Sequence, residues 1–161
     1  MMIIMANPSG ITKREEQLTV AELDELVREL ASRPAEWITQ VRLDSEGRWY
    51  QRIQLSDQHE VWLISWLPGQ STGFHDHGGS AGAFAVVWGS LEEHQAGASR
   101  VVEAGAARSF GPKYIHDVVN NAAGSVAVSV HAYSPPLSEM TRYQLTADGL
   151  VPSGTESEDD W

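Results

Sequence analysis

The sequence contains no cysteine among its 161 residues. This absence excludes disulfide bonds, thiolate metal ligands and a cysteine nucleophile. Structural disulfides belong mainly to oxidising compartments, so a chain without cysteine is compatible with a reducing one. We therefore expect a cytoplasmic protein that folds around a hydrophobic core without covalent cross-links.

Positive charge and long hydrophobic runs are also scarce. Lys and Arg number 11 against 22 Asp and Glu, which gives a formal net charge of −11. Nucleic acids and anionic membranes bind basic patches, so neither is expected as a partner. No apolar run approaches the roughly 20 residues that a membrane span requires. The opening MMIIMANPSG lacks the basic segment of a signal peptide.

The length suits one domain, which we place over residues 1–150 and expect to be monomeric. A helical lead-in is predicted at about 19–42, because Thr19 and Glu22 have capping-box spacing before an apolar stripe. The acidic segment 151–161 is expected to be a disordered tail.

Short β-type segments separated by Gly, Asn and Asp follow the helical lead-in, over about 48–146. This pattern predicts a mainly β domain, either a sandwich or a barrel. The expected strands are 49–55, 60–67, 84–88, a segment around 100–103, 116–120, 126–133 and 142–145.

Two histidines stand two residues apart in a glycine-rich stretch, as His75-Asp76-His77. On an extended backbone, side chains at i and i+2 point to the same face, so this pair offers half of a metal site. Asp76 should point to the opposite face. Such a pair also occurs on protein surfaces by chance, so a third ligand is needed before His75 and His77 can be interpreted as a metal site.

A third histidine, His116, follows a Gly-Pro turn and begins the predicted strand 116–120. It is the best candidate to complete a site with His75 and His77. By contrast, His59 lies in a polar turn and His94 follows two glutamates, so both are expected at the surface.

The segment 126–133 alternates between small or apolar residues and a polar set, Ser129, His131 and Tyr133. The polar face allows two interpretations. It could be solvated, as on many antiparallel strands, or it could form a hydrogen-bonded relay in which each group orients the next.

The pattern around the histidine pair resembles the first motif of the cupin superfamily. It comprises Gly69, His75, His77, Gly82 and Gly89, with Gly82 in place of the usual glutamate ligand. His116, with Asn120 beyond it, resembles the end of the second cupin motif.

The missing carboxylate, Tyr50-x-Arg52 and SVHAYSPP (129–136) together resemble the cysteine dioxygenase family, from the Thr19 helix to about Leu145. The resemblance implies a small cupin barrel (a double-stranded β-helix, or jelly roll). It also implies one Fe(II) per chain, held by His75, His77 and His116, with a small thiol and O₂ as substrates.

The resemblance also assigns the remaining site residues. It implies that Arg52 and Tyr50 bind the substrate, that Ser129, His131 and Tyr133 form a catalytic relay, and that the Ser134-Pro135 bond is cis. Animal members carry a cysteine that cross-links to the relay tyrosine. Glycine occupies that position here, as in bacterial-type members, so no thioether can form.

The reaction implied is the addition of both oxygen atoms of O₂ to the thiol of L-cysteine, which gives cysteine sulfinic acid. Arg52 and Ser134-Pro135-Pro136 favour cysteine, because relatives that prefer 3-mercaptopropionate tend to carry glutamine at the Arg52 position. Two alternatives stay open. One is the same chemistry on 3-mercaptopropionate or another small thiol, and the other is a non-oxygenase metal-binding cupin, for example with zinc.

Overall fold

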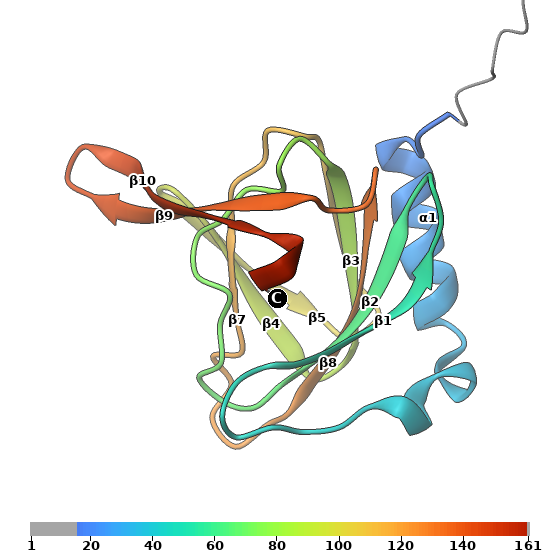
Figure 1. Cartoon of the computed structure of the whole chain (residues 1–161). Helices are drawn as coiled ribbons and strands as arrows, with labels where there is room; N and C mark the ends of the chain where they lie inside the picture. The colour runs from blue at the N-terminus through green and yellow to red at the C-terminus, as the bar shows by residue number, and fades with distance from the viewer. Residues whose placement is uncertain (1–15, 161) are drawn as a thin grey trace, which may run out of the picture.

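A computed structural model of the chain describes residues 16–160, and Figure 1 shows its course. One α-helix, α1 (Val20–Ala31), and two 3₁₀ turns, η1 (Pro34–Glu36) and η2 (Ile38–Gln40), precede the strands. The strands are β1 (Trp49–Leu55), β2 (Glu60–Trp66), β3 (Ala81–Trp88), β4 (Ser90–Gln95), β5 (Ala98–Glu103), β6 (Ala107–Phe110), β7 (Asp117–Val119), β8 (Ala127–Ser134), β9 (Glu139–Thr146) and β10 (Gly149–Ser157), followed by the turn η3 (Glu158–Asp160).

The capping box predicted for the helix is present. The Thr19 side chain accepts a hydrogen bond from the Glu22 amide, and the Glu22 carboxylate accepts one from the Thr19 amide. These two bonds satisfy backbone donors that an α-helix leaves free at its first turn. After Ser32 the chain continues in the two 3₁₀ turns rather than in a second α-helix.

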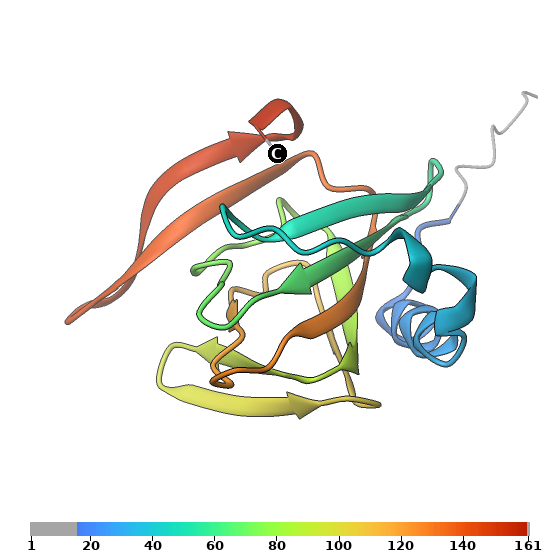
Figure 2. The ribbon, with the colours of Figure 1, turned by 90° about the horizontal axis from the view of Figure 1, so that it is seen from below.

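The strands form a five-stranded sheet, a three-stranded sheet and a hairpin. Their orders are β1-β2-β8-β3-β6, β5-β4-β7 and β10-β9. Helix α1 packs against β3, β6 and β8 on the outside of the larger sheet. In Figure 2, β4 and β5 (yellow) lie at the bottom and the β9–β10 hairpin (orange to red) at the top, with strands of the larger sheet between them.

The centre of the larger sheet is buried on both faces, and every residue of β8 is buried, whereas the edge strand β1 is largely exposed. The valine face of β8 meets α1, whereas the face of Ser129, His131 and Tyr133 points into the interior between the sheets. Of the two interpretations of this polar face, solvation is therefore wrong. Under α1 the core residues are Leu23, Val27, Leu30, Trp37, Val61, Leu63, Ala83, Ala85, Val128, Val130 and Ala132.

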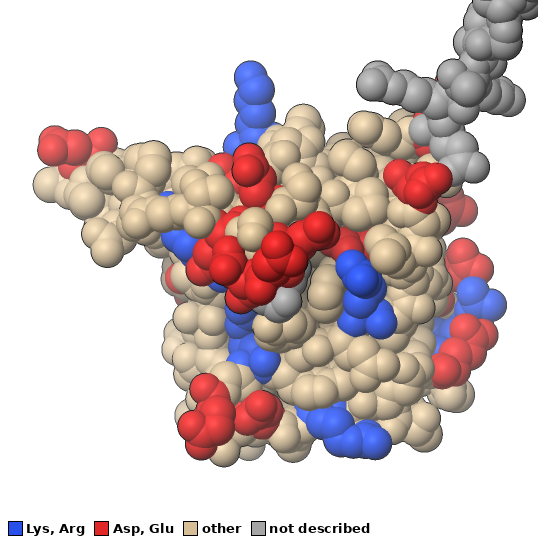
Figure 3. Space-filling view, in the orientation of Figure 1, with Lys and Arg blue, Asp and Glu red and all other residues tan. Residues whose placement is uncertain are grey.

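The acidic segment after residue 150 is ordered as far as the structure describes it, so the expectation of a disordered tail at 151–161 is wrong for 151–160. Strand β10 pairs antiparallel with β9 along its length. Gly149 follows the hairpin turn with φ +102°, which glycine adopts without steric cost. Most acidic side chains here lie at the surface (Figure 3), so a strand can form without burying their charge. Trp161 lies outside the described residues.

Strands β4 and β6 were also not expected, because their sequences are polar or short. Both close the interior around the histidines. Among the described residues, no helix is long and apolar enough to cross a membrane.

Candidate metal centre

His75, His77 and His116 come together in the interior, and all three are buried. His75 and His116 are paired through their backbones, since the amide of each donates to the carbonyl of the other, at 3.0 and 3.2 Å. The Gly-Pro turn before His116 thus delivers it beside the histidine pair, as the sequence predicted.

The histidine pair lies on extended backbone between the His116 segment and β9, rather than inside a regular strand. The Asp76 amide donates to the Thr141 carbonyl at 3.0 Å. The Asp76 carboxylate points away from the site, as expected, and accepts hydrogen bonds from the Thr141 amide and the Tyr143 hydroxyl, both at 2.9 Å. Asp76 therefore fixes the orientation of its two neighbours.

The hydrogen bonds of two of the rings leave the same nitrogen free on each. The Nδ1 atom of His75 faces the Gly73 carbonyl at 2.9 Å, and that of His77 faces the Tyr114 carbonyl at 3.3 Å. A carbonyl oxygen only accepts, so both Nδ1 atoms carry the proton and both Nε2 atoms keep a lone pair.

One nitrogen from each ring lies within 4.8 Å of the other two. The Nε2 atom of His77 is buried and has no hydrogen-bond partner among the described residues. A buried nitrogen lone pair without a donor is unusual in a folded protein and fits a metal ligand. The three residues therefore fit a metal, and no carboxylate is part of the set.

Burial holds the ligand rings neutral. It lowers the pKa of His75 and His77 well below the usual value, and their neighbour His116 lowers both further. A metal needs the neutral ring, so both residues are in the binding form at neutral pH.

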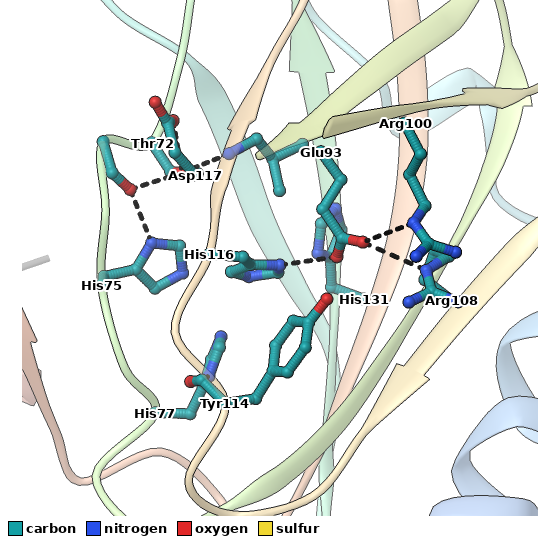
Figure 4. A network of polar contacts seen from close by, with 12 residues as sticks. Thr72, His75, His77, Glu93, Arg100, Arg108, Tyr114, His116, Asp117 and His131 are labelled. Carbon is teal, nitrogen blue, oxygen red and sulfur yellow. Dashed lines mark hydrogen bonds and ion pairs between the residues drawn. The ribbon is translucent and has the colours of Figure 1, made fainter. Parts of the chain in front are cut away.

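The structure adds a residue that the sequence reasoning missed, Glu93 on β4. Its carboxylate accepts hydrogen bonds from His116 Nδ1 at 2.9 Å and from Arg108 Nε at 3.1 Å, and Arg100 lies at 3.9 Å (Figure 4). Burial opposes ionisation of Glu93, but His116 and Arg108 outweigh it and lower the pKa of the carboxyl. The ionised Glu93 keeps the His116 proton on Nδ1. In the sequence, only its spacing of two from the apolar Leu91 indicates that Glu93 faces the interior of the described fold.

Ser129, His131 and Tyr133 form the row expected of a relay. The Ser129 Oγ lies 2.7 Å from His131 Nε2, and the Tyr133 hydroxyl lies 3.5 Å from His131 Nδ1. The indole of Trp66 donates to Ser129 Oγ at 2.8 Å. The single hydroxyl proton of Ser129 then has His131 Nε2 as its acceptor, which leaves the His131 proton on Nδ1, toward Tyr133.

Burial sets the charge of the row. It lowers the pKa of His131 to about 3, with further contributions from His116 and Arg48. Burial, with Glu60 adding to it, raises the pKa of Tyr133. At neutral pH the imidazole is uncharged and the phenol keeps its proton. With His131 Nδ1–H facing the Tyr133 oxygen, the phenol proton is free to point elsewhere.

A cavity of about 250 Å³ adjoins the site, with room for a small molecule. Among its lining residues are His75, His116, His131, Tyr133, Tyr50, Arg48 and Arg142.

Arg52 does not line this cavity. Its guanidinium lies 3.3 Å from the buried carboxylate of Glu60 and packs over the Trp62 ring, with 41% of the side chain exposed. Tyr50 does line the cavity, and its ring packs edge-on against Trp62. The structure thus brings together the predicted histidines, the row on β8 and Tyr50, but not Arg52. The Ser134-Pro135 bond is cis, as expected.

The sequence matches a family model described as Cysteine dioxygenase type I over residues 10–146. A search of curated proteins finds no significant match.

Solved structures similar to this fold include TT1209 from Thermus thermophilus, with 22% identity and TM-score 0.57 over 62% of this chain and 94% of that one. Another is an uncharacterized conserved protein with a double-stranded beta-helix domain from Klebsiella pneumoniae (19%, TM-score 0.57, 73% and 93% covered). An RmlC-like cupin protein from Desulfovibrio desulfuricans is also similar (19%, TM-score 0.54, 60% and 91% covered). These similarities confirm the predicted mainly β cupin barrel with one helix before it.

Proposed function

The chain belongs to the cysteine dioxygenase type I family, and on that premise we propose that it is an Fe(II)-dependent dioxygenase that converts L-cysteine to cysteine sulfinic acid. Both oxygen atoms of O₂ join the substrate sulfur, so the reaction needs no external reductant.

The observation that carries the proposal is the set of three buried histidines without a carboxylate. We assign His75, His77 and His116 as the ligands of one Fe(II), through Nε2. Three neutral ligands leave the charge of a divalent ion uncompensated, which suits an anionic sulfur ligand better than a site with a carboxylate does. When bound, Fe(II) would supply an open cationic site at which sulfur and dioxygen meet.

The residues of the cavity wall then orient the substrate. Tyr133 is protonated and buried beside His77, with ring centroids 5.5 Å apart. We assign its hydroxyl as a hydrogen-bond donor to the substrate or to the developing sulfinate. His131 and Ser129 hold the phenol in place, and Tyr50 forms another part of the cavity wall.

Oxygen uptake by the Fe(II)-loaded protein tests the activity and the substrate together. We expect consumption of O₂ with L-cysteine and a higher kcat/KM for it than for 3-mercaptopropionate. Tyr133→Phe should lower kcat, by about 10- to 100-fold if the phenol donates in the transition state. A higher kcat/KM for 3-mercaptopropionate would overturn the cysteine assignment, and no sulfinate from either thiol with fully loaded iron would overturn the dioxygenase itself.

Metal analysis tests the cofactor separately. Protein made without added metal should bind one Fe(II) per chain on reconstitution, and His116→Ala should not. If only the zinc-loaded protein retains metal, and iron supports no oxygenation, the site belongs to the non-oxygenase class.

A further inference from the structure

The C-terminal segment 154–160, here called the strap, lies beyond the residues that match the family model and reaches the cavity. Glu156 on β10 and Asp160 in η3 both line it. In Figure 1 the C-terminal turn (red) crosses in front of the barrel strands, and in Figure 2 it lies at the top, beside the β9–β10 hairpin. The strap therefore forms part of the wall of the cavity that His75 and His116 also line.

Little buried surface holds the strap in place. Its sequence, GTESEDD, contains no apolar side chain, and every residue in it except Glu156 is exposed. A register shift between Pro152 and Gly154 interrupts the ladder with β9 just before the strap begins. A segment that buries few apolar groups opens locally at a small cost in free energy. The strap can thus separate from β9 while the rest of the hairpin stays paired.

Arg142 on β9 connects the strap to the metal site. Its Nη2 donates to the Glu156 carboxylate at 3.1 Å, and its Nη1 donates to the Thr72 carbonyl. The backbone of Arg142 pairs with that of His75. One residue therefore joins the strap, β9 and the segment that leads into the ligand histidines.

The other contacts of the strap are weaker guides to its position. The Glu158 amide donates to the Ser138 carbonyl at 3.2 Å, and the Asp160 carboxylate accepts a hydrogen bond from the Ser157 amide at 2.8 Å, within the strap itself. Among residues 16–160, Arg142–Glu156 is the one ion pair that joins the strap to the rest of the fold. Both side chains are partly exposed, so this ion pair can break without leaving a buried charge.

We propose that the strap is a lid, held closed by the Arg142–Glu156 ion pair, that limits the size of the thiol admitted to the cavity. The closed cavity holds a thiol the size of one amino acid, whereas a dipeptide that begins with cysteine requires the strap to open. Glu156 is then a positioning residue that acts through Arg142. The consequence for substrates rests on the proposed function, because it takes the cavity as the thiol site.

The first test compares hydrogen–deuterium exchange in Glu156→Gln with that in the matched variant Glu158→Gln. The control removes one charge from the same strap and keeps the backbone bond to Ser138. We expect the strap amides of Glu156→Gln to exchange about 2- to 5-fold faster than those of wild type, the range for a partly exposed ion pair, and those of Glu158→Gln to be unchanged. Glu156→Asp, which keeps the charge, should retain part of the protection. Melting temperatures verify that the variants fold.

The second test measures thiol binding to the Fe(II)-loaded protein without oxygen, by titration calorimetry, so the readout needs no turnover. The probes are L-cysteine and L-cysteinylglycine, which share the thiol and the amine but differ in length. A lid that must open for the longer thiol lowers its affinity by the fraction of molecules that are open. Relative to L-cysteine, L-cysteinylglycine should therefore bind about 2- to 5-fold more tightly to Glu156→Gln than to wild type or Glu158→Gln.

Two results would overturn the proposal. Equal exchange of the strap amides in Glu156→Gln and wild type would show that the ion pair does not hold the strap. Faster exchange with an unchanged ratio of the two affinities would show that the strap does not limit thiol size. Failure of the proposed function is distinguishable, because it shows as the expected exchange and affinities without sulfinate formation when oxygen is admitted.

Discussion

Glu93 and His116 form a buried hydrogen bond in which the carboxylate lies 2.9 Å from Nδ1, with side-chain exposures of 1% and 3%. Glu93 therefore acts on the metal site through the ring that it orients. Arg108 compensates the remaining charge of the carboxylate at 3.1 Å. Such partners of metal-binding histidines fix the tautomer and raise the basicity of the ligand nitrogen.

Replacing Glu93 with glutamine should weaken metal binding. The amide group of glutamine can donate to Nδ1 and so place the His116 proton on Nε2, where it blocks the ligand lone pair. We expect Glu93→Gln to lower Fe(II) affinity by about 10- to 100-fold in a competitive chelator titration. The matched control is Glu92→Gln, whose carboxylate is paired instead with His94 and Asn121. Equal affinities in the two variants would show that Glu93 does not support the site.

Gly82 should not tolerate a side chain. A Cβ at this position would lie 2.6 Å from the Phe110 ring and 2.9 Å from the Tyr133 ring. We expect Gly82→Ala to lower the free energy of unfolding by about 1–3 kcal/mol, since both rings are buried and must shift.

Denaturant unfolding measures this change. Gly111→Ala is the matched control, because a Cβ there meets no atom within 4 Å and the backbone does not have positive φ. A loss of stability no larger in Gly82→Ala than in Gly111→Ala would contradict the packing described around Tyr133.

The metal-free protein should become less stable as the pH falls. The pKa of His131 is about 3 in the fold, whereas an unfolded histidine has a pKa of about 6.5. Between these values the unfolded chain binds more protons than the native one. The free energy of unfolding therefore has its full value above about pH 6.5 and decreases progressively as the pH falls toward 3.

His131→Phe should remove this share of the pH dependence. The new ring keeps the stacking on Phe84, where the native ring centroids are 5.2 Å apart. We expect the free energy of unfolding to change less steeply with pH in the variant than in wild type. Parallel curves for the two proteins would show that His131 is not held neutral by the fold.

Strand β10 should protect its partner from exchange. Its ladder with β9 runs from Gly149↔Thr146 to Ser157↔Glu139. We expect the hydrogen-bonded amides of both strands to exchange with deuterium more slowly than those of the exposed turn around Asp57. Exchange in β10 as fast as in that turn would restore the expectation of a disordered tail.

The sequence predicts most of the site because its residues follow local rules. His75 and His77 share a face by strand periodicity, and His116 follows a Gly-Pro turn. The capping box at Thr19 and the strand 49–55 have the predicted bounds for the same reason.

The partners of the site residues are harder to predict, because long-range pairing determines them. Glu93 reaches His116 only after β4 pairs with β7. Arg52 lies outside the cavity lining beside Glu60, and the position of Glu60 depends on the pairing of β2 with β8. The acidic composition after residue 150 predicts disorder. The pairing of β10 with β9 is a long-range contact that this composition does not reveal.

Product analysis under isotopically labelled dioxygen tests the central claim most directly. The Fe(II)-loaded protein is supplied with L-cysteine and labelled O₂, and the product is identified by mass. We predict cysteine sulfinic acid in which both sulfinate oxygens carry the label, and none from His116→Ala. A product with unlabelled oxygen, or cystine alone from fully loaded wild-type protein, would contradict a dioxygenase at this site.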